Sequence, residues 1–285
     1  MPEGDIVWRT ANRLHAALSG RQIVSSDLRW PSLATADLSG RPVLEVVSRG
    51  KHILVRMGGV DGSPPLTLHS HLRMEGQWRL DRTASRRRPP PDVRAILVTD
   101  EWTATGARLG MLDLVATADE ATLVGHLGPD LLGPDWSAEQ AVANILANPE
   151  RPVGEAVLDQ RNLAGVGTFY LAEALFLVGR TPWTTVGELG PQLVGRVVDR
   201  AYRLLQLNRD RLPQVTTGDA RPGHEAFVHA RSGRPCRRCG TTVRVAPLGE
   251  GPTGRVVFYC PSCQQGPAPT DDARPQRPLG AGRRR

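Results

Sequence analysis

Two residues at the start of the chain could do covalent chemistry together, Pro2 and Glu3. If Met1 is removed, which a small following residue permits, the chain begins with a secondary amine beside a carboxylate. An α-amine has a pKa of about 7.7–8.0, so it is partly neutral and nucleophilic near neutral pH. The adjacent carboxylate could transfer protons. The competing interpretation is a loose chain terminus followed by a helix cap at Asp5.

All four cysteines lie near the C-terminus in two Cys-x-x-Cys pairs, Cys236 with Cys239 and Cys260 with Cys263. This spacing is typical of a tetrahedral zinc ion held by four thiolates. A disulfide framework is the alternative, which close pairs in a cytoplasmic chain disfavour. Four thiolates leave no position for water, so the predicted zinc ion is structural.

A helix is predicted directly after the possible nucleophile. Apolar residues recur every three to four positions over residues 5–19, and Gly20 is placed to end the helix. The partial positive charge at a helix N-terminus disfavours an ammonium ion, which keeps more of the Pro2 amine neutral. The same charge favours an ionised Glu3, so Glu3 needs burial to act as an acid.

Short apolar segments between Gly-rich and Pro-rich turns follow, over residues 21–117. This pattern predicts an antiparallel β-sandwich or barrel. His69 and His71 fall in this region, and we expect both to be structural. The expected strands are residues 23–28, 43–47, 52–57, 66–69, 76–80, 93–98 and 111–115.

The second half of the chain has helical periodicity. Residues 128–136 contain two Gly-Pro-Asp steps, which predict a domain boundary and a hinge. The turn 163–167 is rich in glycine and precedes a predicted helix, an arrangement that can present backbone N–H groups to a phosphate. A plain helical hairpin without a ligand is the alternative. The expected helices are residues 138–148, 152–158, 168–178 and 194–205.

Composition limits the class of protein and its partners. The chain has 285 residues, 40% of them hydrophobic, a net charge of +7 and a pI near 10.0. It is long enough for two or three globular domains, and its basicity suggests a polyanionic partner. Part of the charge lies in two runs of arginine. We see neither a signal peptide nor an apolar membrane-spanning segment, so the expected location is the cytoplasm.

Together these features resemble the formamidopyrimidine-DNA glycosylase and endonuclease VIII family over about residues 1–265. The resemblance implies an α+β multidomain fold. Its parts are an N-terminal antiparallel β-sandwich with an N-terminal helix (1–127), a hinge (128–136), a helix-two-turn-helix domain (137–223), a zinc ribbon (224–265) and a disordered basic tail (266–285). The matching motifs are Pro2-Glu3-Gly4 and Gly50-Lys51-His52, Leu158-Asp159-Gln160 with Leu163-Ala164-Gly165-Val166-Gly167, and Arg255 five residues before Cys260.

The resemblance also implies a reaction. Pro2 attacks the sugar C1′ of a flipped, oxidised nucleotide in damaged DNA, and Glu3 handles protons at the sugar ring. The resulting Schiff base permits β,δ-elimination, which breaks the strand in base excision repair. Lys51 and Arg255 grip the flanking phosphates and have proton-donor roles in the two eliminations. We expect a monomer that associates with the nucleoid.

Further residues are implied as DNA contacts. The loop that contains Arg73 and Met74 resembles the family's intercalating loop, although a core Met74 in a strand turn is a close alternative. Gly167 and Thr168 match the DNA-binding turn, where the family usually has asparagine in place of Thr168. Ala107 and Leu109 replace the arginine and phenylalanine typical of the formamidopyrimidine branch. This favours the endonuclease VIII branch and oxidised pyrimidines.

Other functions remain open at this point. A non-catalytic protein on the same scaffold could hold damaged or single-stranded DNA, but it would not need Pro2 and Glu3. A glycosylase that prefers oxidised purines is another alternative, which the Met74 loop favours. A zinc-ribbon transcription or ribosome-associated factor would leave the N-terminus unexplained.

Overall fold

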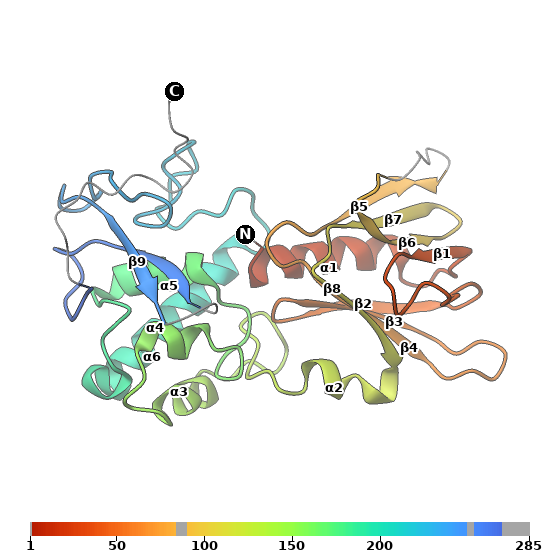
Figure 1. Cartoon of the computed structure of the whole chain (residues 1–285), viewed down its shortest axis with the longest axis horizontal. Coiled ribbons are helices and arrows are strands. Elements are labelled where there is room, and N and C mark those ends of the chain that lie inside the picture. Colours follow the sequence, from red (N-terminus) through yellow and green to blue (C-terminus); the bar gives the residue numbers. More distant parts are fainter. Residues whose placement is uncertain (1, 84–89, 250–253, 270–285) are drawn as a thin grey trace. The chain divides into compact units, whose positions relative to one another are not determined.

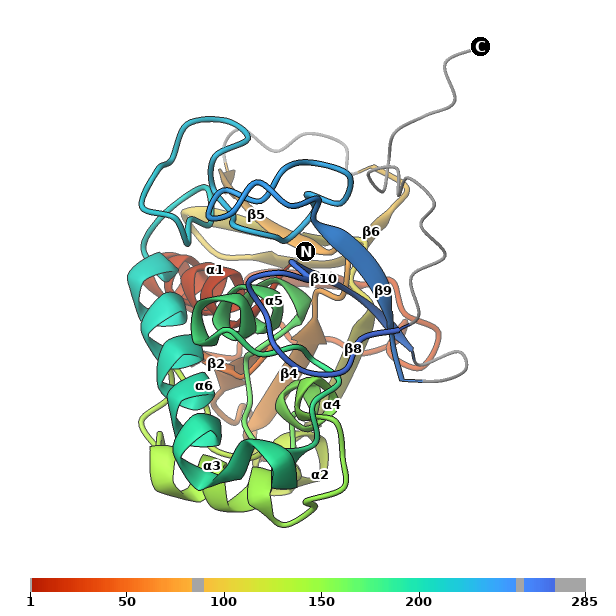
Figure 2. The ribbon, with the colours of Figure 1, turned by 90° about the vertical axis from the view of Figure 1, so that its left-hand side faces the viewer.

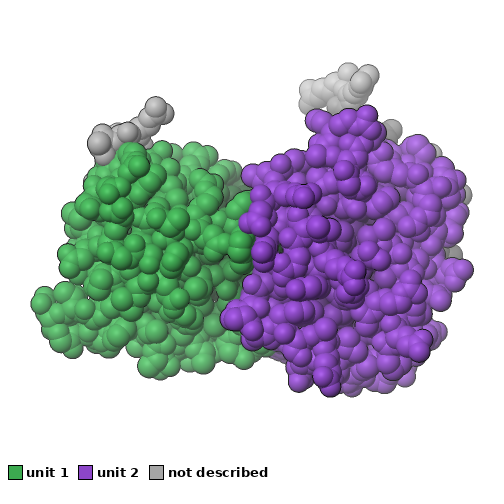
Figure 3. Space-filling model, turned by 180° about the vertical axis from the view of Figure 1, so that it is seen from behind, with its two compact units in different colours: residues 1–127 green, residues 128–285 purple. Residues whose placement is uncertain are grey.

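The computed structural model describes residues 2–83, 90–249 and 254–269. It divides into two compact units, residues 1–127 and residues 128–285 (Figure 3). The predicted tail, residues 266–285, lies mostly outside the described residues. Residues 128–136 belong to the second unit, where Asp130 forms a bridge with Ala164. A hinge role for this segment stays a prediction.

The first unit begins with helix α1 (Gly4–Leu18), which confirms the predicted N-terminal helix. Its buried face follows the helical period of the apolar residues, and α1 packs against strands of both sheets. The N-cap residue is Glu3, so the alternative of a cap at Asp5 is wrong. Asp5 lies in the first helical turn, where the helix dipole favours a negative charge.

Two antiparallel four-stranded sheets form the rest of the first unit (Figure 1). One sheet has the order β1-β6-β7-β5 and the other has the order β2-β3-β4-β8. The short helices η2 (Thr117–Asp119) and α2 (Ala121–Val124) follow β8. The strands are β1 (Ser25–Leu28), β2 (Val43–Arg49), β3 (His52–Met57), β4 (Leu66–His71), β5 (Gln77–Arg82), β6 (Val93–Val98), β7 (Trp102–Ala107) and β8 (Met111–Ala116).

Strand β7 was not predicted, because its sequence is rich in small residues. The structure explains the composition at Gly106. A Cβ atom there would lie 2.7 Å from the Leu109 side chain and 3.1 Å from the Trp78 ring. The strand therefore contains a small residue where two large side chains pack against it.

The second unit contains four longer helices and a hairpin. The helices are α3 (Ala138–Leu146), α4 (Val153–Leu158), α5 (Thr168–Val178) and α6 (Val186–Asn208), and the strands are β9 (Arg244–Leu248) and β10 (Arg255–Tyr259). Helix α6 starts earlier than predicted because Thr185 and Glu188 form a capping box. The helix is interrupted at Gly190, where φ is +70°.

Helix α5 is the centre of the second unit. It contacts α6 and β10 (Figure 2), and its residues from Phe169 to Phe176 are all buried. One hydrophobic core joins the helices to the cysteine-bearing segment, since it includes Phe176, Phe258 and Cys260. The helices and the β-hairpin therefore stabilise each other.

Buried Glu173 on α5 organises a long segment without regular secondary structure. Its carboxylate accepts hydrogen bonds from the backbone N–H groups of Phe227, Val228 and His229 at 2.8–2.9 Å, and one from the Thr216 hydroxyl. A buried carboxylate is tolerated only when hydrogen bonds replace its hydration. The four donors meet this condition and attach the segment to the helix.

We predict that Glu173→Gln lowers the free energy of unfolding of the second unit by about 3 kcal/mol. The amide loses the negative charge and turns an N–H group toward the backbone donors. Urea unfolding followed by circular dichroism measures the loss. Glu188→Gln is the control, because this exposed residue keeps its capping geometry. Equal stability of the two variants would contradict the role of Glu173.

Candidate functional site

The possible nucleophile lies directly before α1. Pro2 is partly exposed, and Glu3 is fully buried with 0% of its surface accessible. The Glu3 carbonyl accepts the first helical hydrogen bond from the Val7 N–H at 3.0 Å. Glu3 therefore has the burial that the sequence argument required of an acid. Pro2 is one residue away, at the positive end of the helix dipole.

Lys51 belongs to the same unit, in the tight turn between β2 and β3. Gly50 in this turn has φ +59°, a conformation that favours glycine, and Arg49 pairs with His52 across the turn. Helix α1 packs against both strands of this hairpin. The element that positions Pro2 and the hairpin that carries Lys51 are therefore in direct contact.

A chain of hydrogen-bonded side chains lies beside Lys51. The His52 Nδ1 atom is 2.7 Å from the His69 Nε2 atom, and the His69 Nδ1 atom is 2.9 Å from an oxygen of Asp113. His69 is buried, whereas 42% of the Asp113 side chain is exposed. We call Asp113, His69 and His52 the histidine chain. It connects a partly exposed carboxylate to the residue that follows Lys51.

The surroundings keep two histidines uncharged. Burial, followed by the charges of neighbouring groups including His71 and Lys51, lowers the pKa of His52 to about 3. Burial and then the charge of Lys51 lower the pKa of His71 to about 4. Both imidazoles are therefore neutral at physiological pH.

His71 also fixes the loop that follows β4. Its Nδ1 atom accepts a hydrogen bond from the Arg73 N–H at 2.9 Å, and Arg73 has φ +50°. A Cβ atom on Gly110 would collide with the Arg73 side chain, so the glycine permits this close packing. Met74 is 65% exposed and is not a core residue. The loop thus presents Arg73 and Met74 at the surface.

In the second unit, Gln160 holds the glycine-rich turn. Its amide nitrogen donates to the carbonyls of Leu158 at 2.8 Å and Val166 at 3.0 Å, and its amide oxygen accepts from the Gly165 N–H at 3.1 Å. Helix α5 begins at Thr168, with Gly167 as an N-cap that makes no side-chain capping bond. The N-terminal end of a helix carries a partial positive charge that favours an anion.

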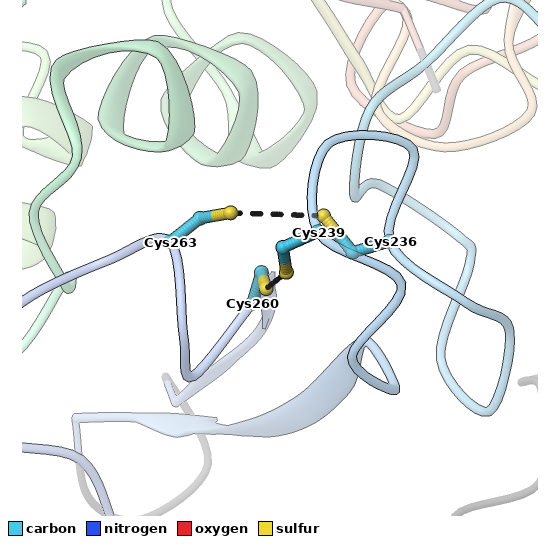
Figure 4. Close-up of side chains that lie close together, drawn as sticks. All are labelled: Cys236, Cys239, Cys260 and Cys263. Carbon is cyan, nitrogen blue, oxygen red and sulfur yellow. Dashed lines mark hydrogen bonds between the residues drawn. The ribbon is translucent and has the colours of Figure 1, made fainter.

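The four cysteines come together at one point (Figure 4). The Sγ atoms of Cys236 and Cys263 are 3.9 Å apart, and those of Cys239 and Cys260 are 3.5 Å apart. All four sulfur atoms lie within 4.8 Å of one another, and no disulfide joins them. Sulfur atoms bound tetrahedrally to zinc at about 2.3 Å would be about 3.8 Å apart. The cluster therefore fits a metal ion.

Arg255 is exposed at the start of β10, opposite Leu248. It lines an open pocket of about 340 Å³ together with Arg151 and Asp159, which pair with each other at 2.8 Å. In the first unit, Pro2 and Glu3 lie side by side at the start of α1. In the second unit, the four cysteines form one cluster. Lys51 belongs to the first unit, and Arg255 to the second.

The sequence interpretation missed the histidine chain. The sequence indicates only structural roles for His69 and His71 and gives no sign of a role for Asp113. The spacing of His69 and His71 was a signal in the sequence that these histidines lie close together, because residues two apart on a strand lie on one face. The long-range pairing of His69 with Asp113 needs the register of β4 with β8, which places them directly opposite each other.

We predict that the protein loses stability as the pH falls below about 6.5. The unfolded histidines protonate near pH 6.5, whereas His52 and His71 resist protonation until about pH 3 and 4, so the unfolded state binds more protons. Calorimetry at pH 7.5 and pH 5 measures the fall in melting temperature. His52→Phe should reduce this fall, while His224→Gln, at a more exposed imidazole, should not. An unchanged fall in His52→Phe would show that His52 does not contribute.

The comparisons with known proteins agree with this architecture. The model of the formamidopyrimidine-DNA glycosylase N-terminal domain matches residues 1–128. The chain is 51% identical over 276 residues to a Streptomyces coelicolor protein named probable endonuclease 8 2, covering 96% of this chain and 98% of that one. It is 46% identical over 264 residues to the DNA-(apurinic or apyrimidinic site) lyase Nei2 of Mycolicibacterium smegmatis, covering 93% and 99%.

A solved structure shares the fold. It is a formamidopyrimidine-DNA glycosylase from Lactococcus lactis, non-covalently bound to DNA that contains an AP site. The TM-score is 0.76 with 22% sequence identity, over 93% of this chain and 100% of that chain. This likeness shows the fold alone, and the near full-length sequence identities show the relationship. The chain belongs to the formamidopyrimidine-DNA glycosylase and endonuclease VIII family of DNA glycosylases and abasic-site lyases.

Proposed function

We propose that the protein is a bifunctional glycosylase and lyase that removes oxidised bases from damaged DNA, with Pro2 as its nucleophile. The observation that carries the proposal is Pro2 directly before α1, next to a fully buried Glu3. Family membership supports the assignment. A protein that only bound DNA would need neither a terminal secondary amine nor a buried acid beside it.

The proposed reaction begins when the neutral Pro2 nitrogen attacks C1′ and the damaged base departs. Glu3 transfers protons at the sugar ring, which opens. A secondary amine can form only a cationic iminium with C1′, and this cation withdraws electrons from the adjacent C–H bond. Loss of the C2′ proton then expels the 3′ phosphate, and a second elimination expels the 5′ phosphate.

Two cations are suited to the flanking phosphates. Lys51 carries a positive charge in the tight turn of the first unit, and Arg255 carries one on an exposed strand end of the second. We assign both to phosphate binding and to proton donation in the eliminations. The planar guanidinium of Arg255 can bind a phosphate with two parallel hydrogen bonds. We assign Gly167 and Thr168, at the start of α5, to the binding of a further phosphate, because the N-terminal end of a helix favours an anion.

The exposed Met74 is suited to fill the space that a flipped nucleotide leaves, because an apolar side chain in the base stack offsets part of the unstacking cost. Ala107 and Leu109 stand where the formamidopyrimidine branch has an arginine and a phenylalanine. We therefore propose oxidised pyrimidines as the preferred lesions.

Within the described residues, no helix is long and apolar enough to cross a membrane.

The four cysteines would hold one structural zinc ion. Four thiolates complete its coordination and leave no position for substrate or water. Zinc would fix the ribbon that carries Arg255, because Cys260 directly follows β10. The ion would supply folding energy to the ribbon and no chemistry to the reaction.

We predict that Cys260→Ser loses the metal and most DNA binding, because zinc binding and folding of the ribbon are coupled. The sandwich of the first unit should stay folded. Metal analysis by mass spectrometry and a DNA-binding titration measure these two results. Ser262→Ala is the control, since this neighbour is not a thiolate. A full zinc content in Cys260→Ser would show that the cluster is not the metal site.

We predict that borohydride traps a covalent complex with abasic-site DNA only when Met1 has been removed. With Met1 retained, the Pro2 nitrogen is an amide and cannot attack. The two forms of the protein, distinguished by intact mass, are compared on a denaturing gel. Equal trapping of both forms would rule out Pro2 as the nucleophile.

A further inference from the structure

The histidine chain has a defined direction of hydrogen bonding. A carboxylate can only accept, so His69 donates its Nδ1 hydrogen to Asp113 at 2.9 Å. With one hydrogen on the ring, His69 has a lone pair on Nε2. This atom lies 2.7 Å from His52 Nδ1, so His52 is the donor in this bond. His52 is therefore protonated on Nδ1 and has a lone pair on Nε2.

The tautomer of His52 matters because of its neighbours. The groups that act on it electrostatically are Lys51, His69, His71 and His126, and Arg49 pairs with it across the turn. His52 directly follows Lys51 at the end of the tight turn, where it pairs with Arg49. The hydrogen bond that holds the His52 ring therefore acts on the residue next to Lys51.

His52 also contacts the imidazole that holds the surface loop. The rings of His52 and His71 meet edge to face with their centres 4.9 Å apart, and His71 accepts the hydrogen bond from the Arg73 N–H. The two rings are opposite each other in the register of β3 with β4. One connected set of side chains therefore runs from Asp113 to the loop that presents Met74.

We propose that Asp113, His69 and His52 are positioning residues that fix the tautomer of His52 and thereby hold Lys51 and the Arg73–Met74 loop in place for the elimination steps. This inference rests on the proposed role of Lys51. The three residues act through Lys51 and need no contact with DNA. Asp113 sets the direction of hydrogen bonding in the histidine chain, because its carboxylate can only accept.

The test is Asp113→Asn, which keeps the shape of the side chain and removes its charge. The amide adds an N–H donor. When this group donates to His69 Nδ1, every hydrogen bond in the chain reverses and the hydrogen lies on His52 Nε2. We expect strand cleavage of abasic-site DNA to slow by about tenfold, part of the roughly 10²–10⁴-fold that a positioned proton-transfer group contributes. Trapping by borohydride should be unchanged. Asp119→Asn, at another exposed carboxylate of this unit, should cleave at the wild-type rate.

Two further measurements separate positioning from a loss of structure. The ¹⁵N shifts of the imidazoles should show His52 protonated on Nδ1 in the wild type and on Nε2 in Asp113→Asn. His52→Phe should cleave as slowly as Asp113→Asn, and the double variant should be no slower than His52→Phe alone. Additive effects, wild-type cleavage by Asp113→Asn, or an Nε2 hydrogen on His52 in the wild type would each overturn the proposal. If a variant does not fold, the tautomer of His52 in the wild-type protein still tests the proposal.

Failure of the proposed function would look different. If the wild-type protein with a free Pro2 forms no trapped complex, the Pro2 mechanism is wrong, whatever the tautomer of His52. If the wild type is trapped and Asp113→Asn is trapped and cleaves equally well, only the inference about the histidine chain is wrong.

Discussion

The constraint on which this structure depends is the fixing of a chain terminus. Terminal residues are ordinarily the least ordered part of a domain, yet the reacting amine proposed here is the terminal one. The apolar face of α1 supplies the order. Val7, Leu14 and Leu18 are almost completely buried, and each contributes about 1.5–3 kcal/mol by leaving water. The buried helix therefore fixes the position of Glu3, its N-cap residue, and of Pro2 next to it.

The two units differ in where their ionisable groups lie. The first buries ionisable groups close to a proposed reacting centre, including Glu3, Asp5 and His69. The second carries Arg255 at an exposed strand end, which we propose to bind a phosphate, and hydrogen bonds to Glu173 hold its irregular segment. Burial lowers the pKa values of His52 and His71 in the first unit, and the exposed cation of the second is suited to the proposed binding of DNA.

Local patterns in the sequence predicted the parts of the fold that local physics determines. The period of α1, the short apolar run of a strand such as β3 and the spacing of the cysteines each follow from neighbouring residues. Strand β7 was missed because a tertiary contact requires its glycine. A larger residue at Gly106 would lie too close to the Trp78 ring. Pro2 became a candidate through the chemistry of a terminal secondary amine, and Lys51 through a family resemblance. Their roles are proposals.

The histidine chain shows the limit of sequence reasoning most clearly. His69 and Asp113 are 44 positions apart and meet only through the register of β4 with β8. Neither residue is unusual in its own segment. Glu173 is similar, because its backbone partners lie more than 50 positions away. Interactions of this kind depend on the finished topology, which local periodicity does not contain.

The most direct test of the central claim is a crystal structure of the borohydride-reduced complex with abasic-site DNA. The account predicts a single covalent bond between the Pro2 nitrogen and C1′ of the opened sugar, at the N-terminal end of α1. A bond from C1′ to a lysine side chain would contradict it.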